Sequence, residues 1–112
     1  MSKFSELACE ACKAGAPPAT DEELLEFMGN HSDWSKIETK DVQKLVRVYS
    51  FSNFVDALAF TNKVGVLAEQ EGHHPALLTE WGRVTVSWWT HKIGGLHRND
   101  LIMSARTDDL YV

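Results

Sequence analysis

The stretch that decides the fold covers residues 52–90 and reads SNFVDALAFTNKVGVLAEQEGHHPALLTEWGRVTVSWWT. In its first half, apolar residues recur at steps of three and four, which is the spacing of one face of an α-helix. We expect Ser52 to cap this helix and Gly72 to end it in the left-handed conformation. The second half predicts a β-hairpin, because two alternating runs at 76–79 and 83–90 are separated by a tight turn.

A short helix and a second hairpin are predicted upstream of this stretch. Thr20 and Glu23 have the spacing of a capping box, and apolar residues follow them at helical spacing as far as Gly29. A brief strand at 34–37 and a longer, alternating strand at 43–51 are then expected to pair through the turn between them.

A last helix is predicted downstream, beyond a break at Gly94-Gly95. His97 and Asp100 open it, and Asp100 then stands at the third helical position, where a carboxylate can reach back to the cap. The element order αββαββα predicts an α+β domain with a four-stranded, mainly antiparallel sheet and three helices packed on one face. Such a sheet leaves one face and its edges uncovered, and association with another copy would cover them.

Length and charge limit the classes of function. The chain has 112 residues, and we expect one domain over 20–112, preceded by an N-terminal arm and linker over 1–19. Sixteen acidic against eleven basic residues give a net charge of -5, which argues against direct nucleic-acid binding. No apolar run is long enough for a membrane span and no signal peptide is visible, so a cytoplasmic protein is predicted.

Three of the five histidines fall in one ordered pattern with four other residues: Glu69-x3-His73-His74-Pro75-x5-Trp81-x9-His91-x8-Asp100. Histidine titrates near neutral pH, so such a cluster suits proton transfer in both directions. The pattern resembles the signature of the pterin-4a-carbinolamine dehydratases. The runs at 53–54, 59–65 and 77–81 are also similar to the bacterial members that accompany phenylalanine hydroxylase, and the resemblance covers about residues 20–107.

The resemblance implies an activity and a role for each residue of the pattern. Members of this family convert 4a-hydroxytetrahydrobiopterin to quinonoid dihydropterin and water, after an aromatic amino acid hydroxylase has used the pterin. By resemblance, His73 and His91 hold the acid and base positions, and His74 binds and orients the pterin. The remaining residues are expected to bind the substrate or to support the site: Glu69 by hydrogen bonding, Trp81 as a wall of the pocket, Pro75 by fixing the chain direction, and Asp100 as a support.

Purely structural explanations stay open for two of these residues. Helix capping alone explains the spacing of Asp100 from His97, and Trp81 can equally be a residue of the core. The chemistry itself is undemanding: an acid for the departing hydroxyl, a base for a ring proton and a pocket for a flat heterocycle. Neither a redox cofactor nor a metal is therefore expected.

A zinc site is one alternative, because histidine is a common zinc ligand. It would combine His73, His74 and His91 with one of the two cysteines, Cys9 or Cys12. Adjacent histidines rarely converge on one ion, however, and the cysteines lie beyond the predicted linker. Two cysteines in a single Cys-x-x-Cys pair fit a reducing compartment better than a disulfide scaffold.

The alternative function is that of a protein-binding module. Animal relatives in the family also act as a dimerisation cofactor of a transcription factor, and bacterial relatives are linked to gene regulation or enzyme assembly. The resemblance implies a homodimer that joins sheets edge to edge, or a homotetramer formed through helices as well. The expected partner is phenylalanine hydroxylase or a regulatory protein, since a net charge of -5 permits contact with a protein but disfavours DNA.

Overall fold

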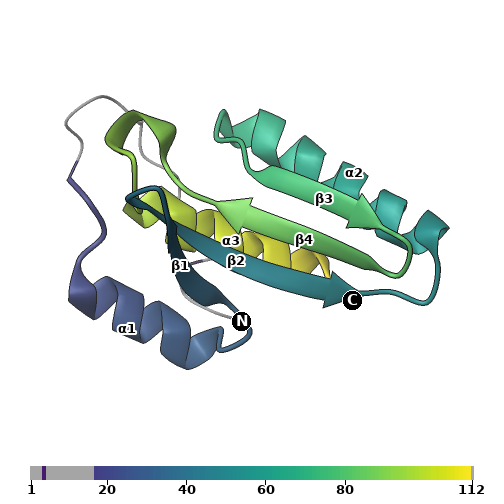
Figure 1. Cartoon of the computed structure of the whole chain (residues 1–112), viewed down its shortest axis with the longest axis horizontal. Helices are drawn as coiled ribbons and strands as arrows, with labels where there is room; N and C mark the ends of the chain where they lie inside the picture. Colours follow the sequence, from purple (N-terminus) through teal and green to yellow (C-terminus); the bar gives the residue numbers. More distant parts are fainter. Residues whose placement is uncertain (1–3, 5–16, 112) are drawn as a thin grey trace.

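The computed structural model describes residue 4 and residues 17–111, and it shows one sheet with helices on one side (Figure 1). The elements follow in the predicted order αββαββα, with a short 3-10 helix before the last α-helix. They are α1 (Asp21–Asn30), β1 (Ser35–Thr39), β2 (Val42–Ser50), α2 (Phe54–Glu71), β3 (Ala76–Glu80), β4 (Arg83–Trp88), η2 (His91–Ile93) and α3 (Arg98–Leu110). The strands pair in the order β1-β2-β4-β3 and every pair is antiparallel, so the predicted α+β architecture is confirmed.

Local signals set most element boundaries as predicted. Thr20 opens α1 in a capping box, and Gly72 ends α2 in the left-handed conformation. The predicted cap at Ser52 is wrong: Asn53 caps α2, because its side-chain oxygen accepts the backbone N–H of Asp56 at 2.8 Å. The strands keep their predicted places, with ends that differ from the prediction by one or two residues.

The two faces of the sheet differ in burial, because successive side chains along a strand point to opposite faces. The face toward α2 and α3 carries the buried side chains of the two central strands, namely Leu45, Tyr49, Val84, Val86 and Trp88. On the opposite face, Ile37, Val48 and Leu78 are 42%, 53% and 57% exposed. The sheet therefore has one covered face and one open, partly apolar face.

A polar cluster at the C-terminal end of α3 joins this helix to β2 and to the end of α1. One oxygen of Asp108 accepts hydrogen bonds from Arg47 Nη1 at 2.7 Å and from the Tyr49 hydroxyl at 2.5 Å. His31 Nδ1 lies 2.5 Å from the other oxygen, and Trp34 Nε1 lies 3.0 Å from the first. Burial, followed by the hydrogen bond to Asp108, raises the pKa of Tyr49 above its ordinary value.

Some sequence predictions concern residues that the structure does not describe. Cys9, Cys12 and positions 14–16 of the predicted linker lie outside the described residues. Phe4, which is described, is 2% exposed and packs edge-on against Phe27, with 5.9 Å between the ring centroids. Among the described residues, no helix is both long enough and apolar enough to cross a membrane.

Candidate active site

The end of α2 places two of the predicted histidines. Gly72 has a φ of 63°, a backbone conformation that residues with a Cβ adopt only with strain. The N–H of the next residue, His73, returns to the carbonyl of Ala68 at 3.2 Å and closes the helix end. This turn directs His73 inward, where it is 7% exposed, while the His74 side chain stays 58% exposed.

The buried imidazole of His73 meets a buried carboxylate. Its Nε2 atom lies 2.6 Å from Oδ1 of Asp100, which is fully buried. The second oxygen, Oδ2, accepts the hydroxyl of Thr90 at 2.7 Å and the backbone N–H of His97 at 2.8 Å. The last bond completes the predicted capping box of α3, so Asp100 caps the helix and contacts His73 at once. The positive end of the α3 dipole also favours a carboxylate here.

The end of β4 brings the third histidine to the same place. Thr90, which is bound to Asp100, directly precedes His91, and His91 begins η2 with an exposed side chain. Trp88, at the end of β4, stacks on the His73 ring with centroids 5.6 Å apart and planes within 8°. His73 and His91 thus lie at the same end of the β3–β4 hairpin, connected through Asp100 and Thr90.

A second and more exposed pair lies beside this cluster. Nε2 of His74 is 2.5 Å from Oε1 of Glu69, and the two side chains are 58% and 77% exposed. Contacts between exposed charged groups contribute little to stability, typically about 0–1 kcal/mol. This pair is therefore open to a ligand, whereas the His73–Asp100 pair is fixed by its surroundings.

The other two residues of the sequence pattern are placed differently. Pro75 joins His74 directly to the first residue of β3, and its fixed φ sets the direction in which the strand leaves the site. Trp81 lies in the turn between β3 and β4 and is 73% exposed. That turn is the opposite end of the hairpin from His73 and His91 (Figure 1). The structure therefore does not bring Trp81 to the histidines.

Two further residues contribute to this region and were not predicted from the sequence, namely Thr90 and Trp89. Thr90 is buried and directly precedes His91. Its place in the alternating pattern of the strand predicts that it faces the core, where a buried hydroxyl needs a hydrogen-bond partner. Trp89 contacts the His91 ring, with centroids 4.5 Å apart and planes tilted by 41°. Strand alternation predicts which face of the sheet Trp89 occupies, but nothing in the sequence predicts this contact.

The arrangement suits proton transfer. One imidazole is buried and held by a carboxylate, and two others are exposed at the same end of one hairpin. Because their environments differ, one imidazole can donate a proton to a bound substrate while another accepts one. Within residue 4 and residues 17–111, no group of three or more His, Cys, Asp or Glu side chains is arranged to hold a metal ion.

Comparison with known proteins gives close relatives along nearly the whole chain. A protein of Syntrophotalea carbinolica is 59% identical over 110 residues, which cover 98% of each chain. A protein of Marinobacter nauticus is 56% identical over 111 residues, which cover 99% of this chain and 100% of the relative. Both carry the name pterin-4-alpha-carbinolamine dehydratase as a provisional assignment.

Two solved structures are similar in fold. A transcriptional coactivator/pterin dehydratase from Brucella melitensis has a TM-score of 0.75 at 23% identity, covering 86% of this chain and 100% of that one. A pterin dehydratase-like protein, identified as a RuBisCO assembly factor in the alpha-carboxysome, has a TM-score of 0.60 at 21% identity, covering 72% and 92%. At these identities the likeness shows the fold alone.

The family is shown by the sequence match. Residues 17–110 match the family described as pterin 4 alpha carbinolamine dehydratase. This range spans the whole of the spaced pattern, from Glu69 to Asp100. Together with the relatives of 59% and 56% identity, it shows that the chain belongs to the pterin 4 alpha carbinolamine dehydratase family.

Proposed function

We propose that the chain is a 4a-hydroxytetrahydrobiopterin dehydratase that works by histidine acid–base catalysis. The observation that carries the proposal is the contact of the buried His73 with Asp100, which Thr90 connects to the exposed His91. Two imidazoles in unlike environments can divide the acid and base roles between them. The family of the chain and the names of its relatives support the class of substrate.

The reaction needs two proton transfers and no electron transfer. The hydroxyl on carbon 4a leaves as water after it receives a proton, and the neighbouring ring nitrogen gives up its proton as the C=N bond forms. One imidazolium supplies the first proton and one neutral imidazole accepts the second, so the protons balance. We assign these two roles to His73 and His91 as a pair. Help of this kind is worth on the order of 10²- to 10⁴-fold in rate.

The neighbouring residues position or bind. Asp100 is a positioning residue: it accepts the Nε2–H of neutral His73 and so fixes the tautomer and the plane of the ring. His74 and Glu69 are exposed beside this ring and are assigned to the pterin. Pro75 fixes the chain direction between His74 and β3. Trp81 has no role in this proposal, because within one chain it lies at the far end of the hairpin.

The biological role that follows is the recycling of tetrahydrobiopterin. An aromatic amino acid hydroxylase, such as phenylalanine hydroxylase, leaves its pterin as the 4a-carbinolamine, which must lose water before it can be reduced again. A cytoplasmic location fits this role. The loss of water already proceeds slowly without an enzyme. The modest acceleration that acid–base catalysis provides is therefore sufficient.

A direct dehydration assay with 4a-hydroxytetrahydropterin tests the proposal. We expect the wild-type chain to accelerate the loss of water, and we expect His73→Ala and His91→Ala each to lower the rate by about 100-fold. Lys36→Ala is the control, because Lys36 is exposed on β1 and belongs to no part of the site. Circular dichroism establishes that each variant is folded. A wild-type chain that does not exceed the rate in buffer rules out the dehydratase.

A protein-binding role is the second candidate, and an apolar row on α2 favours it. Val55, Leu58 and Val66 are 74%, 44% and 59% exposed, and their spacing places them along one side of the helix. Exposed apolar patches of this kind mark contact surfaces in soluble proteins. Such a surface would also serve the predicted homotetramer, in which helices of two dimers pack together.

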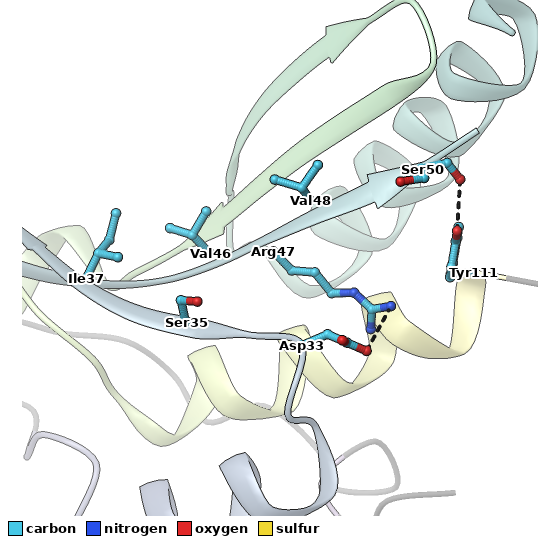
Figure 2. A pocket seen from close by; sticks show the side chains of 8 residues that line it. All are labelled: Asp33, Ser35, Ile37, Val46, Arg47, Val48, Ser50 and Tyr111. Carbon is cyan, nitrogen blue, oxygen red and sulfur yellow. Dashed lines mark hydrogen bonds and ion pairs between the residues drawn. The ribbon is translucent and has the colours of Figure 1, made fainter. Parts of the chain in front are cut away.

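The free edge of β2 supports a homodimer joined sheet to sheet. Pairing with β1 ends at Ser35 and Val46, so positions 47–50 of β2 have a strand on one side only. A groove of about 520 Å³ lies along this edge, with Arg47 reaching toward Asp33 and the Tyr111 hydroxyl bound to the Ser50 carbonyl (Figure 2). Unpaired edges of this kind invite another strand.

Light scattering tests both surfaces together. We expect a mass of two or four chains for the wild type. Val55→Asp should lower this mass if α2 packs against another copy, and Val48→Lys should give a monomer. A mass of one chain for the wild type would contradict the dimer and the tetramer, and would leave the row on α2 for a different protein.

A further inference from the structure

Trp89 and Lys44 form a support under His91 that the sequence pattern does not include. The Trp89 ring lies 4.5 Å from the His91 ring, and Nζ of Lys44 lies 4.3 Å from the Trp89 ring centroid. We propose that Trp89 is the positioning residue of His91 and that Lys44 in turn holds the Trp89 ring. The proposal rests on the assignment of His91 to proton transfer in the dehydration.

A support of this kind matters because the described part of the chain gives the His91 side chain no polar partner. It is exposed, and within residue 4 and residues 17–111 no hydrogen bond or ion pair is formed by its imidazole. An exposed histidine free to rotate loses entropy whenever it takes the reactive orientation. Contact with a flat indole limits that rotation without using either ring nitrogen, so both nitrogens stay available for protons.

The support follows from the way β4 ends. Trp88 and Trp89 are consecutive and point to opposite faces of the sheet, the first buried and the second partly exposed. Trp88 stacks on His73 on the covered face, while Trp89 contacts His91. Each histidine of the proposed acid–base pair therefore rests on its own tryptophan, and the two tryptophans come from one strand end.

Each tryptophan is fixed by a different contact. The Nε1–H of Trp88 donates to the buried Thr107 hydroxyl at 3.1 Å, which locks that ring into the core. Trp89 lies outside the core, and its ring is held by the ammonium of Lys44 through a cation–π contact. The register explains why Lys44 is the partner: Leu45 pairs with Trp88, so the residue before Leu45 lies beside the residue after Trp88.

Steady-state kinetics of Trp89→Leu, Trp89→Phe and Lys44→Met test the proposal. Leucine keeps bulk but removes the flat ring, phenylalanine keeps a flat ring, and methionine keeps the stem of lysine without its charge. We expect Trp89→Leu to lower kcat by roughly tenfold with little change in KM, because an oriented group is lost rather than a substrate contact. Trp89→Phe restores most of the rate, and Lys44→Met lowers it by about two- to threefold.

The matched control is Lys36→Met, which removes a lysine from the neighbouring strand. Lys36 pairs with Leu45, so it points to the other face of the sheet from Lys44. We expect this variant to turn over like the wild type. The proposal is wrong if Trp89→Leu keeps the wild-type kcat, or if it raises KM alone, since Trp89 would then be part of the substrate surface.

A readout without substrate separates this inference from the proposed function. The ring current of Trp89 should displace the proton resonances of the His91 imidazole, which are identified by their loss in His91→Gln. We expect the displacement to persist in Trp89→Phe, to shrink in Lys44→Met and to vanish in Trp89→Leu. A folded Trp89→Leu chain with an unchanged His91 spectrum overturns the positioning role. An inactive wild type with a displaced His91 signal overturns the dehydratase and leaves the positioning intact.

Discussion

Two aspartates of α3, the buried Asp100 and the partly buried Asp108, have opposite tasks, although they stand on one helix about 12 Å apart along its axis. Asp108, whose side chain is 14% exposed, is surrounded by donors that include the permanent cation of Arg47. Asp100 is fully buried with a hydroxyl, a backbone N–H and the His73 ring as its partners. A carboxylate whose oxygens are occupied by fixed donors stabilises the fold, whereas a carboxylate that contacts an imidazole orients a reactive group.

The Asp108 cluster should account for the largest loss of stability. Asp108→Asn keeps the shape of the side chain but leaves the Arg47 guanidinium without its nearest counter-charge, at 2.7 Å in the native chain. Removing one member of a largely buried ion pair costs about 3 kcal/mol. Urea unfolding measures this free-energy change. The turnover per folded molecule should stay at the wild-type level, and a loss below about 1 kcal/mol would show that the cluster is not a structural lock.

Asp100→Asn should give the reverse result, with a large loss of activity and a smaller loss of stability. The amide oxygen can still accept the His97 N–H, so the α3 cap survives at a cost of about 1 kcal/mol. The amide nitrogen then faces Nε2 of His73 as a donor and forces the proton to the other ring nitrogen. We expect kcat for the dehydration to fall by about 100-fold. An unchanged kcat would mean that Asp100 only caps the helix.

The sequence predicts the contact of Asp100 with the cap of its own helix, but it does not predict the contact of Asp100 with His73. The capping box from His97 to Asp100 is readable because its two residues are three apart in the chain. The contact between Asp100 and His73 joins residues 27 apart, and only the pairing of β3 with β4 brings their segments together. Local spacing predicts caps and turns well. It does not predict tertiary contacts such as the one between the cap residue Asp100 and His73.

The remaining differences have the same origin. The partners of Asp108 come from β2 and from the loop between α1 and β1, so no window of sequence contains the cluster. Trp81 stands six positions after Pro75, and an extended strand carries the chain about 3.3 Å per residue, so β3 takes Trp81 away from the site. Regular spacing along the chain thus identified the family but could not tell one end of the hairpin from the other.

The smallest effect that separates the two clusters is a fall in stability at alkaline pH. We expect it only for the Asp108 cluster, because that cluster contains a tyrosine. The Tyr49 hydroxyl donates to Asp108 at 2.5 Å, and burial together with this bond raises the pKa of Tyr49 above its ordinary value of 10.0. Above pH 10 the unfolded chain loses the tyrosine proton while the folded chain keeps it. The folded state then binds more protons, and stability falls as the pH rises, by up to about 1.4 kcal/mol per pH unit.

Tyr49→Phe should remove this alkaline loss. At pH 7 the variant lacks one hydrogen bond to Asp108 and should be less stable by about 1 kcal/mol. Because phenylalanine has no proton to lose, the stability curves of variant and wild type should converge between pH 10 and the pH at which the wild type unfolds. Urea unfolding at several pH values measures both curves. Asp100→Asn leaves Tyr49 in place, so its stability curve should run parallel to that of the wild type over the same pH range. Equal slopes for Tyr49→Phe and the wild type would show that another group causes the alkaline loss.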